Sequence, residues 1–297
     1  MSQSDAEGEV VVRLFRYMPL CWGVEAALTG WFKTTRPCEM NDPFECLGCV
    51  CGQVPRAVYE EYIHANYDEI KRQLQQRDMM LGIGPHDYSE QNVFDAYYPR
   101  HVKVFENQVI MRESYNEIGS FICFVDHNGL SDEAQRLMWA HYADGGKGVR
   151  IEFEFNEDND CSAYVFQRVK YAEKPPTCDL CAVDHWPKCD SIYKFLIECL
   201  LTKSLEWAYE NEVRMIISKR MAKGLIRTMP RGDGGLIELV YLRPEMIVGI
   251  TFGVRVCDSD INAVQEAFSE VRETSAHFFK RMVHSDKSRY SVRESLV

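Results

Sequence analysis

Apolar and polar residues alternate over several segments of the chain, and this period of two predicts β-strands. Residues 10–17 (VVVRLFRY) would form an opening strand with Arg16 at the end of an otherwise apolar face. Residues 149–155 alternate strictly, so their apolar side chains are expected to point inward and the charged ones between them toward solvent. Further strands are predicted at 31–35, 120–125, 163–171, 210–218, 235–242 and 246–253, with 163–171 paired to 149–155.

Helical spacing and capping residues predict helices between these strands. Residues 23–30 would form a short helix ended by Gly30, and residues 131–142 would form a helix that Ser131 caps. A long polar and charged stretch predicts a helical insertion at about 56–118. Two more helices are expected, at 191–208 and 258–283.

The order of these elements indicates the fold class. Strands and helices interleave without a regular βα repeat, which favours an α+β fold over a doubly wound sheet. The 297 residues have a globular composition, so we expect a single domain over 1–297 that carries the helical insertion.

The net charge and the hydropathy of the chain argue against some classes of function. The net charge of −11 argues against a protein that coats DNA or RNA, because phosphate binding needs a basic surface. A small anionic ligand needs only one or two placed arginines and stays compatible with this charge. The sequence has neither a long apolar run nor a recognisable signal peptide, so a cytoplasmic protein without a membrane partner is expected.

Twelve cysteines are expected to be free thiols in such a chain. Four residues of the segment CDLCAVDHWPKC have the order Cys-x2-Cys-x3-His-x3-Cys, which could close a tetrahedral zinc site. These residues are Cys178, Cys181, His185 and Cys189. The alternative is a thiol-rich surface loop without metal.

Two carboxylates and an arginine are closely spaced in the segment WAYENEVRMII. In a strand, Glu210, Glu212 and Arg214 would share one face. One interpretation is a carboxylate that stabilises a developing oxocarbenium ion, with Arg16 as a phosphate anchor. The other is a structural pair in which Arg214 neutralises Glu212.

The segment LMWAHYADGGKG runs into the strand at 149–155. Trp139 is expected in the core, whereas Tyr142, which follows His141 at the helix end, could stack on a flat heterocycle. The glycines after them are expected to form a helix end and a turn, and they do not have the spacing of a phosphate-binding loop.

The segment NDPFE has turn chemistry. Asp42 is expected to cap its own loop and Phe44 to fill the core. A second interpretation makes Asp42 and Glu45 metal ligands of a nuclease, although no lysine or histidine lies close to them in the sequence.

Several of these segments occur in the order seen in a bacterial family catalogued as domain of unknown function 2971. The segments are LFRYMPL, MNDPFEC, ICFVDHNG, LMWAHYADGGKGVRIEF, VKYAEKPP and LLTKSLEWAYENEVRMII. The chain resembles this family from about 12 to 255. It departs from the family pattern at Val125, where serine is frequent, and at Gly146, where histidine is frequent.

More distantly, an arginine on the first strand, a middle aromatic element and a late Glu-x-Glu strand resemble the ADP-ribosyltransferase superfamily. The resemblance implies a mixed, mostly antiparallel sheet and NAD as a substrate. Carried over, Arg16 would anchor NAD, Tyr142 and His141 would line the nicotinamide pocket, Glu212 would be catalytic and Glu210 would position the acceptor. The superfamily's Ser-Thr-Ser strand motif has no counterpart at Cys123–Val125.

The resemblance implies transfer of ADP-ribose from NAD to a macromolecule, or hydrolysis of NAD, in a bacterial toxin or a phage-defence protein. An alternative is a recognition module without catalysis that binds a nucleotide or a protein. The metal-dependent nuclease is a third hypothesis.

Overall fold

The computed structural model describes residues 11–42, 44–51, 55–80, 86–106, 120–156, 164–179, 190–217, 222, 224–232, 234–275, 277–286 and 291–297. The chain forms two compact units. The first consists of residues 1–36, 118–169 and 206–297, and the second of residues 37–117 and 170–205. That the chain is one domain stays a prediction.

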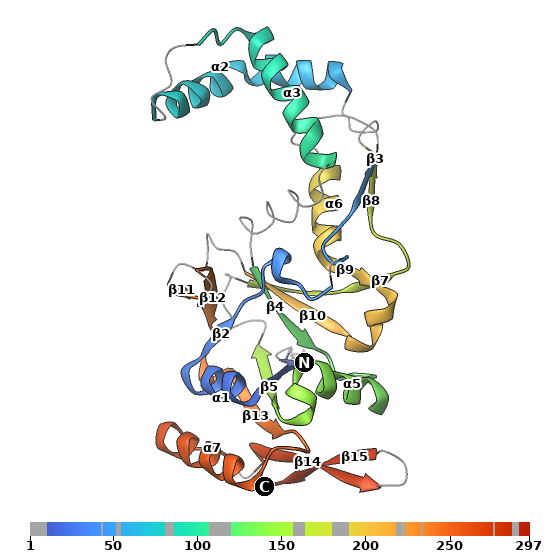
Figure 1. The fold of residues 1–297 in the computed structure, drawn as a ribbon, viewed down its shortest axis with the longest axis vertical. Helices are drawn as coiled ribbons and strands as arrows, with labels where there is room; N and C mark the ends of the chain where they lie inside the picture. The colour runs from blue at the N-terminus through green and yellow to red at the C-terminus, as the bar shows by residue number, and fades with distance from the viewer. Residues whose placement is uncertain are drawn as a thin grey trace, which may run out of the picture. The chain divides into compact units, whose positions relative to one another are not determined.

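An eight-stranded sheet forms the centre of the first unit (Figure 1). Its order is β15-β14-β13-β5-β1-β4-β10-β6, and every neighbouring pair is antiparallel except β13 with β14. The strands are β1 (Val11–Met18), β4 (Ser120–Val125), β5 (Val149–Asn156), β6 (Tyr164–Arg168), β10 (Glu212–Ile217), β13 (Ile247–Phe252), β14 (Phe279–Asp286) and β15 (Ser291–Leu296). The predicted α+β class with a mixed, mostly antiparallel sheet is confirmed.

Each face of this sheet is covered by different elements. The larger core lies on the face that carries Leu14, Phe153 and Met215, where α1 (Leu20–Thr29), α7 (Asp258–Val271) and a smaller sheet pack. That smaller sheet contains β11 (Ile226–Pro230), β12 (Leu236–Tyr241) and β2 (Trp31–Lys33). On the opposite face, α5 (Asp132–Tyr142) packs Met138 and Trp139 against Phe15, Tyr17 and Val125. Alternation along each strand therefore assigns every side chain to one of two environments.

Local signals set the ends of two helices as predicted. Gly30 ends α1 in the left-handed conformation at φ 76°, and its N–H donates to the carbonyl of Ala26. Ser131 caps α5, where its hydroxyl accepts from the N–H of Ala134.

The second unit has a separate core. Long helices α2 (Arg56–Met80) and α3 (Glu90–Glu106) confirm the helical insertion over the residues of 56–118 that are described. Their aromatic residues form a core with Phe195 and Cys199 of α6 (Asp190–Leu201). Two short parallel strand pairs complete the unit. They join β3 (Cys49–Cys51) to β8 (Thr177–Asp179) and β7 (Lys170–Ala172) to β9 (Thr202–Ser204).

Two helix predictions were too long. The helix expected at 191–208 ends at Leu201, because residues 202–204 pair as β9 and a 3-10 segment, Leu205–Glu210, follows. The helix expected at 258–283 ends at Val271, and residues from Phe279 onward form β14. On β14, Phe279 points into the larger core and Met282 points to the opposite face of the sheet, as expected for a strand inside a sheet that is covered on both faces.

Two strand predictions were also wrong. The segment 163–171 does not pair with β5, because β1 and β13 already occupy both edges of β5; β6 pairs with β10 instead. Arg150 and Glu152 are buried rather than directed to solvent, since the second face of this interior strand is covered too. Among the described residues, no helix is long and apolar enough to cross a membrane.

Candidate functional site

Four rings gather at the surface of the first unit. His141 and Tyr142 end α5, and Trp207 and Tyr209 belong to the 3-10 segment before β10. The His141 ring centroid lies 6.2 Å from that of Tyr142, 6.4 Å from that of Trp207 and 6.0 Å from that of Tyr209. His141 is exposed and the other three are half-buried, so this set, the ring cluster, is open to solvent.

Hydrogen bonds hold the ring cluster together. The Tyr209 hydroxyl and His141 Nδ1 lie 3.0 Å apart, and the Tyr142 hydroxyl donates to the carboxylate of Glu210, which is buried. Asn211 follows in the left-handed conformation at φ 43°, and its side-chain amide donates to the carbonyl of Asp126 at 2.6 Å. This turn holds the buried Glu210 next to Tyr142, and β10 starts at the residue after Asn211.

Glu212 and Arg214 form a buried ion pair on β10. Arg214 Nε donates to Glu212 Oε1 at 2.8 Å and Nη2 lies 3.3 Å from Oε2, while the two side chains are 0% and 4% exposed. The guanidinium also lies 4.8 Å from the ring centre of Phe121. Burial lowers the pKa of Arg214 to about 9, which reflects the cost of removing its charge from water. The geometry is that of the structural pair considered from the sequence.

Arg16 belongs to a different environment. Its Nη2 donates to the backbone carbonyl of Lys33 at 3.0 Å, and its Nη1 is buried without a hydrogen-bond partner. Burial lowers the pKa of Arg16 to about 10, an effect that Cys123 partly opposes. Among the described residues, the hydrogen bond to Lys33 is therefore the one that holds this half-buried cation.

Strand alternation places Arg16 and Glu212 on opposite faces of the sheet. Along β1, Arg16 shares its face with Leu14 and Met18, which belong to the larger core. Along β10, Glu212 points away from that core, since Val213 and Met215 point into it. The structure therefore brings Tyr142, His141 and Glu210 together, whereas Arg16 and Glu212 project from opposite faces.

Trp207 and Tyr209 were not predicted as site residues. Helical spacing placed Trp207 on the inner face of a longer helix, but the helix stops six residues earlier and the 3-10 segment turns both rings toward His141. The sequence signal was the Trp-x-Tyr-Glu pattern itself, which puts two aromatic residues beside a carboxylate.

His127 and Tyr17 form a second polar contact, next to Phe15 on the face of the sheet that carries α5. The His127 ring stacks on Phe15 at 3.8 Å, and His127 Nε2 lies 3.0 Å from the Tyr17 hydroxyl. Burial and the nearby Arg150 cation lower the pKa of His127 to about 3, and burial raises the pKa of Tyr17 to about 12. Both groups are therefore neutral in the folded protein at pH 7.

The residues of the nuclease hypothesis lie in the second unit. Asp42 caps its own loop as expected, accepting from the N–H of Phe44 at 2.9 Å, but Phe44 is 77% exposed and does not fill the core. Lys203 Nζ lies 3.5 Å from Glu45 Oε2, and both side chains are buried. Tertiary structure thus supplies the lysine that the neighbouring sequence lacks. In the described part of the chain, however, no group of three His, Cys, Asp or Glu residues could hold a metal ion.

The zinc hypothesis falls mostly outside the described residues. Cys178 lies buried on β8, and Cys181, His185 and Cys189 are not among the residues that the structure describes. The zinc site stays a prediction.

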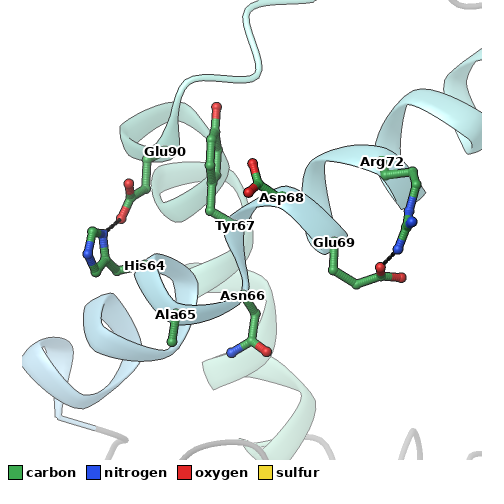
Figure 2. A pocket seen from close by; sticks show the side chains of 8 residues that line it. All are labelled: His64, Ala65, Asn66, Tyr67, Asp68, Glu69, Arg72 and Glu90. Atoms are coloured by element: carbon green, nitrogen blue, oxygen red, sulfur yellow. Dashed lines mark hydrogen bonds and ion pairs between the residues drawn. The ribbon is translucent and has the colours of Figure 1, made fainter.

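A polar hollow of about 640 Å³ lies on the helices of the second unit (Figure 2). Figure 2 shows His64 of α2 paired with Glu90 of α3, and Glu69 paired with Arg72 along α2. The hollow is open and contains none of the residues predicted to carry function.

Residues 138–215 match the model of a family described as a protein of unknown function (DUF2971). The match confirms the resemblance for this segment, which contains the whole ring cluster, Glu210 and the Glu212–Arg214 pair. Comparisons with curated proteins and with solved structures gave no significant match. The resemblance to ADP-ribosyltransferases stays a prediction.

Proposed function

We propose that the ring cluster binds a nucleotide by stacking its flat heterocycle. The observation that carries this proposal is the gathering of four rings, one exposed and three half-buried, from two segments that the family match joins. Stacking on aromatic side chains contributes about 1–3 kcal/mol per base, so even two contacts would give useful affinity.

The nicotinamide end of oxidised NAD suits the charges around the rings. The nicotinamide ring of oxidised NAD is a flat cation, and aromatic faces attract cations. Glu210 lies behind the rings and Glu206 is exposed in the same 3-10 segment, which adds negative potential. Reduced NAD carries a neutral nicotinamide and should bind more weakly.

Transfer of ADP-ribose or hydrolysis of NAD is a second candidate, supported by Glu210. In this chemistry the bond between nicotinamide and the ribose carbon breaks, nicotinamide leaves with the bonding electrons, and water or an acceptor supplies the new oxygen or nitrogen bond and releases a proton. A carboxylate beside the ribose stabilises the developing positive charge. Glu210 lies at the ring cluster, where its carboxylate accepts from the Tyr142 hydroxyl, and Glu212 is paired with Arg214 further along β10.

Binding is tested by titrating NAD and reduced NAD while following tryptophan fluorescence or heat. Trp207→Ala should weaken NAD binding at least tenfold. Trp22→Ala is the matched control, because Trp22 is a 59% exposed tryptophan of the same unit on α1. The proposal fails if the wild-type protein does not bind NAD, or if both alanine variants bind it equally well.

Turnover is tested separately by nicotinamide release in the presence of protein, RNA and DNA acceptors. Tyr142→Phe keeps the ring and removes the hydroxyl that donates to Glu210, so it should reduce turnover more than binding. If the protein binds NAD but releases no nicotinamide under any of these conditions, the enzyme hypothesis is refuted and the hypothesis of a recognition module is retained.

A further inference from the structure

A groove of about 430 Å³ runs between α1 and α7 in the first unit. Leu20, Val24 and Leu28 of α1 line one wall, and Ala263 and Val264 of α7 line the other. The three α1 residues recur every four positions, so they form a row about 12 Å long on one side of the helix. No residue of the ring cluster takes part, so the groove is a separate feature.

Helix α1 is more apolar than a solvated surface helix. Its ten residues, LCWGVEAALT, include one charged side chain, Glu25. Ala26 and Ala27 are buried in the core, Leu20, Val24 and Leu28 pack against it and stay half-buried, and Trp22 is 59% exposed. A helix that is apolar nearly all round is normally covered, and exposed tryptophan is typical of binding surfaces.

The rim of the groove is acidic. Glu25 and Asp260 line it, and neither forms an ion pair with any residue of the described chain. A second copy of the protein would bring the same carboxylates face to face, and each copy carries a net charge of −11. Like charges oppose self-association, whereas lysine or arginine residues of a partner would complement the rim.

We propose that the α1–α7 groove binds an amphipathic helix of a partner protein, with apolar residues toward the groove and basic residues beside them. The row on α1 matches the one-turn spacing of apolar residues on such a helix, which is the usual pattern of helix-in-groove recognition. The carboxylates of Glu25 and Asp260 would attract the basic residues that flank the apolar face of this helix.

The test uses a fluorescein-labelled 18-residue helical peptide of leucine and lysine, with leucine on one face. A second peptide has glutamate in place of every lysine. Fluorescence anisotropy should show at least tenfold tighter binding of the lysine peptide, and the difference should shrink at 0.5 M salt.

Variants locate the binding on the protein. Val24→Gln makes the groove floor polar and should weaken the lysine peptide at least fivefold, whereas Val271→Gln changes an exposed valine of α7 outside the groove and should have no effect. Glu25→Gln lies at the surface, leaves the core intact and should weaken binding and its salt dependence.

Equal binding to the Val24→Gln and Val271→Gln variants, or an unchanged affinity in Glu25→Gln, would overturn the proposal. A wild-type dimer in solution that Val24→Gln converts to a monomer would instead assign the groove to a second copy and refute the partner helix.

Discussion

Replacing Glu212 by glutamine should destabilise the protein strongly, because it leaves the Arg214 charge without the carboxylate that receives two of its N–H groups. Glutamine has nearly the same shape, so the change removes charge and leaves the packing of β10 in place. Arg214 is fully buried, and water cannot replace the lost partner.

The magnitude follows from the burial of the pair. Removing one partner of a buried ion pair costs about 3–5 kcal/mol. Since burial already lowers the pKa of Arg214 to about 9 with Glu212 in place, we expect a loss in this range. Removing both charges should cost less, so Glu212→Gln combined with Arg214→Met should recover at least 1 kcal/mol relative to Glu212→Gln alone.

Urea unfolding followed by circular dichroism measures these free energies, and Glu154→Gln supplies the control. Glu154 pairs with Arg13 at 2.8 Å on the same sheet, but both side chains are substantially exposed, so this pair should contribute less than 1 kcal/mol. If Glu212→Gln and Glu154→Gln lower the free energy of unfolding equally, the structural role of the buried pair is refuted.

The expected destabilisation also affects how function is assayed. A Glu212→Gln protein that fails to act on NAD could have lost its fold rather than a catalytic group. Trp207→Ala tests function with less risk to the fold, because Trp207 is half-buried in a ring cluster that is open to solvent. Tyr142→Phe removes a hydrogen bond from the buried Glu210 carboxylate, so its free energy of unfolding is measured beside its activity.

Two further perturbations test the packing around β1 and α1. The pKa of His127 is about 3 in the folded protein and near 6.5 in the unfolded chain, so its stabilising contribution is fully present well above pH 6.5 and is lost as the pH falls toward 3. Between pH 6.5 and 5 the free energy of unfolding should fall by about 1.6 kcal/mol more in wild type than in His127→Gln. The same pH dependence of this free energy in both proteins, measured by urea unfolding, would contradict the prediction. Gly30→Ala should lower the free energy of unfolding more than Gly129→Ala in the same assay. Both glycines have φ near +76°, but of the two only Gly30 would bring a Cβ against a carbonyl, that of Leu242, at 2.7 Å. An equal loss of about 1–2 kcal/mol in both variants would show that backbone strain alone acts.

Local signals in the sequence were sufficient for many of the elements. The strand at 120–125 was predicted with its observed bounds, and Ser131 and Gly30 mark helix ends because their effects depend only on neighbouring backbone groups. The α+β class followed from the order of these elements. The predicted ends of the helices that stop at Leu201 and Val271 were wrong, because the residues after them pair or pack with segments far away in the sequence.

In the candidate site, too, some residues were predicted from the sequence and others depend on the tertiary structure. The sequence and the family resemblance proposed His141, Tyr142 and Glu210 as site residues, and the structure brings these three close together. The sequence missed Trp207 and Tyr209, because their approach to His141 depends on where α6 ends and how the 3-10 segment turns.

What the sequence by itself determined is therefore many of the elements and the two faces of the predicted strands, which follow from the period of two. Only the tertiary structure decided how those faces combine. Strand order and register place the Arg16 face of β1 in the larger core and the Glu212 face of β10 on the opposite side of the sheet. Alternation within a strand is local, whereas pairing between strands is set by long-range packing, and that packing determines which predicted residues can share a site.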